Sequence, residues 1–259
     1  MRPLLALLDA PEPAVKIAAA AALLAVVAID PGVLAQEAVD WTGSALASTD
    51  FKVRTSGASV LGDLPVKAAL PLLAKAIADT EVPVRKAAAT SAGKLRDREV
   101  ASQLVAAVGS EGDASTKEAM VRSLGLIGDA IARDALLSLA ADTGRLGVLA
   151  SGSLIAIGDT TAVARLDADM RGGGRDLKLA VVDASVIAHN RVVVPVLTVG
   201  NGDRDAAVSF ASAEALTRLG DALSAMAWVS TSLPPSSPIL ARPSAAASRA
   251  FSSGSASRL

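Results

Sequence analysis

The sequence predicts an all-α protein, in which about seven pairs of antiparallel helices stack into a right-handed α-solenoid. Three observations lead to this fold class. A pattern of residues recurs about every 31 positions over most of the chain. Within each copy, apolar residues follow a helical period. The composition is 51% hydrophobic but only 2% aromatic, so small aliphatic residues must fill the core. Repeated two-helix units of this kind bury their apolar faces by stacking on one another.

Each copy is defined by an anchor residue near the start of one helix of the pair. Successive anchors are separated by 38, 31, 32, 30, 31 and 31 residues. Apolar residues four, eight and eleven positions after the anchor share one helical face with it, which predicts a helix packed along that face. The anchors are Val15, Val53, Val84, Thr116, Leu146, Leu177 and Val208.

Charged residues flank the anchors at fixed offsets. Five of the seven copies carry an acid three residues before the anchor, and five carry a base one residue after it. An acid at this place can cap the start of a helix, and the base can pair with it or with the acid of a neighbouring copy. We therefore expect a structural charge ladder, which in four copies comprises Glu12, Lys16, Asp50, Arg54, Glu81, Arg85, Asp113 and Lys117.

A Gly-Asp dipeptide closes the anchor helix in several copies, at residues 128–129, 158–159 and 220–221. Glycine there provides the left-handed residue that ends many helices. In the sixth copy His189-Asn190 takes this place, which we interpret as a variant of the same turn rather than as a ligand. A second, shorter apolar helix then leads to the next copy, and examples are residues 70–77, 100–108, 133–140 and 194–199.

The repeat pattern V-R-x-x-A-A-x-x-L-G-x-I-G-D resembles HEAT-like repeats, in the short form that also occurs in phycobiliprotein lyases. The segment TKEAMVRSLGLIGD, residues 116–129, is nearest to it. The resemblance covers about residues 1–228 and implies that the anchor helices line the concave surface of the solenoid. It does not fix a function, because this family serves as scaffolds, as adaptors and in a few enzymes.

The two ends of the chain differ in character. Residues 1–228 are expected to form the solenoid, and residues 229–259 a disordered tail rich in Ser, Ala, Pro and Arg. Two interpretations of this tail remain open: a flexible basic segment, or a C-terminal sequence translated from a shifted reading frame. The apolar run at residues 17–29 raises the alternative of a signal peptide, but the repeat accounts for the same residues. We therefore expect a cytoplasmic protein.

The composition excludes several kinds of chemistry. The chain has no cysteine and one histidine, which argues against disulfides, cysteine nucleophiles and histidine-based metal sites. A net charge of −1 gives no electrostatic reason to expect a nucleic acid or an anionic membrane as partner. No cofactor is expected.

Two short motifs could be interpreted as a catalytic site or as an anion-binding site. Ser91 and Lys94 have the spacing of some serine acyl-enzymes, but they lie within a repeat helix, so we interpret them as structural. The glycines at 172–174, between two arginines, could hold an anion but are expected to form a loop.

The side of each anchor helix that faces away from its anchor is a candidate partner surface. It is polar in the early copies and apolar in copies five to seven. An apolar patch on a concave surface is a candidate partner groove, unless helix rotation or an adjacent segment buries it. The candidate residues are Lys86, Thr90, Glu118, Arg122, Val148, Ile155, Leu179, Asp183, Val186 and Phe210.

From these features the leading hypothesis is a non-enzymatic scaffold or adaptor that binds a protein partner on the concave surface. Two alternatives remain open. The repeat resemblance also suggests a chromophore-lyase-like subunit, and the chain could be a fragment of a larger HEAT-repeat protein.

Overall fold

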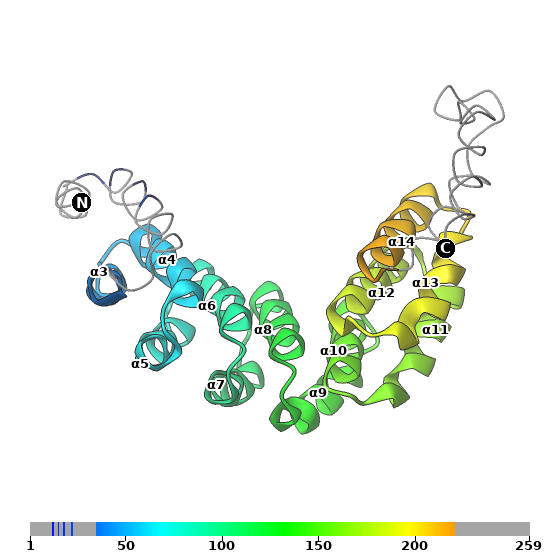
Figure 1. Ribbon diagram of the computed structural model, residues 1–259, viewed down its shortest axis with the longest axis horizontal. Coiled ribbons are helices and arrows are strands. Elements are labelled where there is room, and N and C mark those ends of the chain that lie inside the picture. The colour runs from blue at the N-terminus through cyan, green and yellow to red at the C-terminus, as the bar shows by residue number, and fades with distance from the viewer. Residues whose placement is uncertain (1–11, 13–14, 16–17, 19–21, 23–34, 221–259) are drawn as a thin grey trace, which may run out of the picture.

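The computed structural model describes residues 35–220 together with residues 12, 15, 18 and 22. All the elements of residues 35–220 are helices, and they form an arch of two layers (Figure 1). The all-α class and the solenoid architecture are thus confirmed. None of the described helices is long and apolar enough to cross a membrane. The predicted tail at residues 229–259 and the apolar run at residues 17–29 lie largely or wholly outside the described residues.

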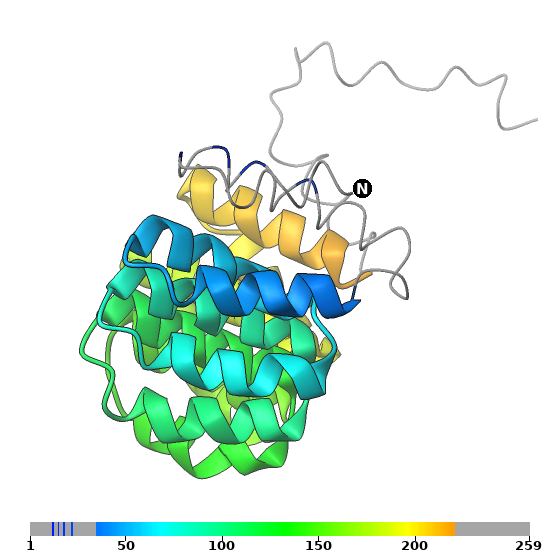
Figure 2. The same cartoon turned by 90° about the vertical axis from the view of Figure 1, so that its left-hand side faces the viewer.

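The two layers alternate along the chain. The anchor helices form the inner layer, which lines the concave side of the arch (Figure 1), and their bounds are α4 Phe51–Val60, α6 Val82–Leu95, α8 Ala114–Ile127, α10 Arg145–Ala156, α12 Arg175–Ala188 and α14 Ala206–Arg218. The outer layer consists of α3 Ala35–Ala45, α5 Val66–Ile77, α7 Arg98–Val108, α9 Arg133–Ala140, α11 Val163–Gly172 and α13 Val194–Asn201. Figure 2 shows helices of successive copies lying one above another with roughly parallel axes.

Residues 35–220 contain the anchor helices of copies two to seven, each preceded by an outer helix. In each of them the anchor residue sits in the first turn of the inner helix and is buried or half-buried. The short second helices match the predicted segments, with α9 at 133–140 and α7 beginning two residues before the predicted 100–108. Short 3-10 turns that were not foreseen precede or follow several helices, namely η1 Leu61–Asp63, η2 Ala130–Ala132, η3 Thr160–Ala162 and η4 Arg191–Val193.

Helix ends follow the chemistry of the repeat. Asp50, Asp113 and Asp205 each precede an inner helix, and their carboxylates accept hydrogen bonds from free backbone N–H groups of its first turn. The glycines that close copies four, five and seven have φ values of 73°, 98° and 81°, as a left-handed terminal residue requires. His189 adopts the same conformation with φ 42°, and so does Arg96 with φ 47°. His189 is therefore a turn residue, and Asn190 caps the next turn through Val192 N.

The inner helices are held close together by small residues. Serines seven positions after the anchor donate hydrogen bonds across the interface to a backbone carbonyl of the preceding inner helix. These bonds are Ser91 Oγ to Ser59 O at 3.0 Å, Ser123 Oγ to Ala89 O at 2.6 Å and Ser153 Oγ to Val121 O at 2.8 Å. Glycines remove the side chains that would separate the backbones. A Cβ atom built on Gly152 would lie 2.3 Å from Ala184 O, so α10 and α12 approach closely only because residue 152 lacks a side chain.

We expect Gly152→Ala to destabilise the protein by about 1–3 kcal/mol, because the new methyl group must push α12 away from α10. Gly109 is the matched control: a Cβ atom there meets nothing within 4 Å, and its φ of −67° suits alanine. Gly109→Ala should be neutral or slightly stabilising. Urea denaturation of both variants measures the difference. Equal stabilities of the two variants would contradict the packing argument.

Candidate partner-binding surface

The concave side of the arch carries exposed residues near both ends of the described inner layer. Lys86 and Thr90 are exposed on α6. Leu179 and Val186 are half-buried on α12, and Phe210 on α14 is 59% exposed. These five predicted surface residues therefore contribute to the surface, with a polar character on α6 and an apolar character on α12 and α14.

Two of the predicted surface residues are not on the surface. Val148 and Ile155 of α10 are both 0% exposed, so the expectation that they form part of an apolar groove is wrong. The physical reason is the close approach of α8 and α12, which lie on either side of α10 and also touch one another. A Cβ atom on Gly125 would lie 2.6 Å from the Ile187 side chain, so this approach also depends on a glycine of α8.

A network of charged residues joins α8, α10 and α12, which we call the concave clasp: Glu118, Arg122, Arg145 and Asp183. Arg145 contacts Glu118 at 3.1 Å and Asp183 at 2.6 Å. Arg122 contacts Asp183 at 3.1 Å, although 61 residues separate them in the chain. Three of these residues were predicted for the surface, but Arg145 was missed because it precedes its anchor. The clasp ties copies four and six together over α10.

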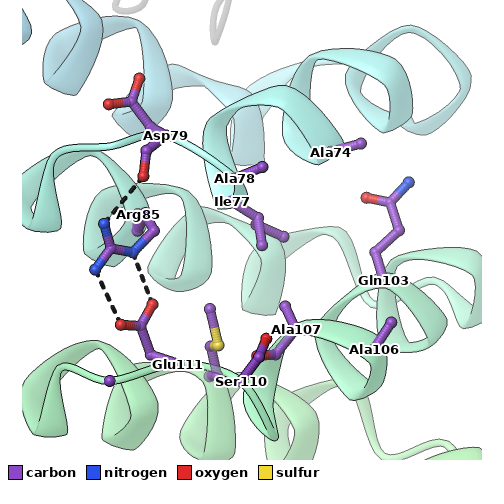
Figure 3. Close-up of a pocket in the computed structure, with 12 residues that line it drawn as sticks. Ala74, Ile77, Ala78, Asp79, Arg85, Gln103, Ala106, Ala107, Ser110 and Glu111 are labelled. Atoms are coloured by element: carbon purple, nitrogen blue, oxygen red, sulfur yellow. Dashed lines mark hydrogen bonds and ion pairs between the residues drawn. The ribbon is translucent and has the colours of Figure 1, made fainter.

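Ion pairs between successive copies form a charge ladder, but their acids are not the ones predicted. The base after the anchor pairs with an acid five residues before the next anchor, rather than three. Arg54 binds Asp79 at 2.8 Å, and Arg85 binds Glu111 at 2.8 Å (Figure 3). Lys178 binds Asp203 at 2.6 Å. The recurrence of an acid at this offset in copies three, four and seven is visible in the sequence and could have revealed the pairs.

The arginines of the ladder also bind the loops between helices. Arg85 Nη1 donates to Asp79 O and Thr80 O, both at 3.0 Å, and Arg54 makes the equivalent bonds to Ser48 O and Thr49 O. One guanidinium group thus joins its own incoming loop to the next copy. In the fifth copy the residue after the anchor is Gly147, which has no side chain to make these bonds. Arg165 of α11 donates instead to carbonyls at the loop that leads into α10, those of Ala140 and Asp142.

The other predicted ladder residues have different roles. Asp50 and Asp113 are caps, and Glu81 precedes α6 without a side-chain capping bond. Lys117 is half-buried and forms no ion pair among the described residues. Glu12 is exposed, and Lys16 lies outside the described residues.

The ladder lowers the pKa values of its acids. Hydrogen bonds from Arg85 hold the pKa of Glu111 below its ordinary value, and this outweighs the opposite effect of burial. Arg54 lowers the pKa of Asp79 in the same way. The pKa of Asp203 is lowered by Lys178 and by the backbone N–H of Asp205. These carboxylates are therefore ionised and paired at neutral pH.

The two motifs considered as catalytic or anion-binding sites, Ser91 with Lys94 and the glycines at 172–174, have structural roles. Ser91 is buried, and its hydroxyl donates to Ser59 O, while Lys94 Nζ lies 3.2 Å from Asp63. Both groups are thus engaged with the preceding copy. The glycines at 172–174 connect α11 to α12 as expected for a loop. Among the described residues, no group of three or more His, Asp or Glu side chains could hold a metal ion.

Comparison with known proteins decides the family. A family model of HEAT repeats matches residues 1–92 and 72–156, which together make up more than half of the chain. The chain belongs to the HEAT-repeat family. A search of curated proteins finds no match.

The HEAT-repeat chain is also similar to a solved structure, that of the complex of CpcE and CpcF of phycocyanin lyase from Nostoc sp. PCC7120. The TM-score is 0.62 at 19% sequence identity, and the match covers 89% of this chain and 93% of that chain. At this identity the likeness establishes a shared fold. It also contradicts the expectation of a non-enzymatic protein, which rested on the scarcity of His, Cys and Tyr, because the same fold occurs in a lyase.

The lowered pKa of Glu111 predicts a pH dependence of stability. The stabilisation from its pair with Arg85 is complete above the ordinary glutamate pKa of about 4.3 and is lost as pH falls through the lowered folded-state value. We expect Glu111→Gln to cost about 1–3 kcal/mol at pH 7, because Glu111 is only 4% exposed in this pair. The variant should then lose less stability than the wild type between about pH 5 and pH 3.

Urea denaturation at a series of pH values measures both effects. Asp63→Asn is the control, since its pair with Lys94 is exposed and should contribute less than about 1 kcal/mol. A Glu111→Gln variant with the pH profile of the wild type would show that the pair does not stabilise the folded state.

Proposed function

We propose that this HEAT-repeat protein is a subunit that binds a partner protein along its concave surface. The observation that carries the proposal is the 59% exposed side chain of Phe210 on α14, with the half-buried Leu179 and Val186 on the neighbouring inner helix α12. Large apolar side chains that gather on a concave surface are typical of protein-binding sites. An aromatic residue is also the kind of side chain that anchors an interface.

The polar part of the concave surface supports the same proposal. Lys52 and Ser59 are exposed on α4, and Lys86 and Thr90 are exposed on α6. A partner with an apolar segment for α12 and α14 and an acidic or polar segment for α4 and α6 would complement both parts. The lysines would then contribute to partner choice and to the rate of association more than to affinity.

The similarity to a complex of two lyase subunits gives a second line of support. In that structure, the matched chain belongs to a complex of CpcE and CpcF. For this chain we infer a partner of the same kind, another protein.

We expect Phe210→Glu to weaken partner binding at least tenfold, because a charge would replace an apolar anchor in the interface. The measurement is an affinity purification from the native cell extract with the full chain as bait, followed by titration of the captured protein. Leu137→Glu is the matched control: Leu137 is also an exposed apolar residue, at 41%, but it lies on the outer helix α9.

A partner that is lost with Phe210→Glu and retained with Leu137→Glu supports binding on the concave surface. A partner lost equally with both variants, or with neither, contradicts it. Circular dichroism spectra establish that both variants keep their helices, so that a loss of binding is not a loss of fold.

A second candidate function is that of a subunit of a chromophore lyase, supported by the similarity to the phycocyanin lyase complex. It predicts that the protein changes the visible absorbance of an added bilin in a saturable manner. Titration of a bilin with the protein, alone and together with its captured partner, measures this change. A spectrum identical to that with an unrelated helical protein in both titrations would exclude the lyase function.

A further inference from the structure

A pocket with a volume of about 570 Å³ lies between the outer helices α5 and α7 (Figure 3). It is on the opposite layer from the concave surface. Its walls are largely apolar and consist mainly of short side chains, from Ala74, Ile77, Ala78, Ala106, Ala107 and Met120. A volume of this size falls within the range of about 300–1,000 Å³ that is typical of sites for small organic molecules.

The pocket follows from the curvature of the arch. The inner helices α6 and α8 are held together by Ser123 and by the absence of a side chain at Gly93, whose Cβ atom would lie 2.9 Å from Ser123 Oγ. When the inner layer is this tight, the outer helices of successive copies spread apart. Between α5 and α7 the alanine side chains are too short to close the space, so a pocket remains.

One polar atom in the pocket wall has no partner. Gln103 Nε2 donates a hydrogen bond to Leu70 O at 3.2 Å, while Gln103 Oε1 is buried and accepts no hydrogen bond. The amide cannot be exchanged end for end, because Leu70 O accepts hydrogen bonds only, so the NH₂ group must face it. Figure 3 shows the oxygen on the side of the amide that faces Ile77 and Ala78. A buried acceptor without a donor is unfavourable, and a ligand that brings a donor would relieve this.

The charged residues of the pocket are already paired. Glu111 is bound by Arg85, and Arg85 also donates to the carbonyl of Asp79, as Figure 3 shows. The carboxylate of Asp79 is bound by Arg54. This end of the pocket therefore offers no unpaired charge to an ionic ligand. What remains is a mainly apolar space with two neutral polar groups, the hydroxyl of Ser110, which donates to Ala107 O, and the buried Gln103 Oε1, which has no donor.

We propose that this pocket binds a small, neutral and mainly apolar molecule that carries a single O–H or N–H donor, such as a phenol or an indole. The ring fills the space between the alanines of α5 and α7, and the donor binds Gln103 Oε1. The terminal torsion of a glutamine side chain is broad, so a small rotation brings Oε1 toward the ligand while the bond to Leu70 O is kept.

The experiment compares two probes that differ only in the donor, 4-methylphenol and 4-methylanisole. Each is titrated into the full chain, and binding is followed by NMR through the Gln103 side-chain amide and the Ala74 methyl group. We expect saturable binding of 4-methylphenol, about tenfold tighter than that of 4-methylanisole, the factor for one hydrogen bond to a buried group. Gln103→Leu should abolish this difference between the probes.

Ala74→Phe should fill the pocket and prevent binding of both probes. The matched control is Lys75→Phe, at an exposed neighbouring position that does not line the pocket, and it should bind as the wild type does. No saturable binding of 4-methylphenol to the wild type would overturn the proposal. Equal binding of the two probes, or unchanged binding by Ala74→Phe, would overturn it as well.

Discussion

Close contact between the backbones of neighbouring inner helices is the constraint on which the rest of the structure depends. Gly93, Gly125 and Gly152 stand where a side chain would collide with the next helix. Buried serines use the short distance to bind a carbonyl of the preceding helix. With almost no aromatic residues in the chain, stability comes from many close contacts of this kind rather than from a few large buried rings.

This constraint also shapes the surface that a partner would meet. Because α8 and α12 close over α10, Val148 and Ile155 are buried, and the concave clasp of Glu118, Arg122, Arg145 and Asp183 takes their place. Exposed lysine and hydroxyl side chains lie on α4 and α6, together with the 39% exposed Phe51 of α4, whereas α12 and α14 carry the apolar Leu179, Val186 and Phe210. The change from polar to apolar residues along the inner layer agrees with the sequence pattern, except that the apolar residues Val148 and Ile155 of α10 are buried.

The repeat period, the inner helices and the glycine turns could all be predicted from the sequence, because each is a local pattern repeated at a fixed interval. The acid caps at Asp50 and Asp113 were predictable for the same reason. For Val148 the sequence left both exposure in a groove and burial open, since its burial depends on residues two copies apart that meet only once the arch is curved. The pairing of Arg85 with Glu111 was not predicted, because the repeat pattern indicated the acid three residues before each anchor, whereas in the structure Arg85 reaches the acid five residues before the next anchor. The pocket between α5 and α7 also arises from curvature, and no short motif encodes it.

The difference in packing between the two layers gives the arch a mechanical asymmetry. The inner helices are joined by serine hydrogen bonds and by close backbone contacts at Gly93, Gly125 and Gly152, so we expect the arch to bend about this layer as a pivot. The outer helices lie about one helix diameter, roughly 10 Å, from this pivot, and their separation changes most when the arch bends. A molecule bound between α5 and α7 would therefore resist straightening of the arch, which brings these two helices together, and would not resist further closure, which moves them apart. The width of the concave surface and the width of the pocket between α5 and α7 are thus coupled through the curvature of the arch.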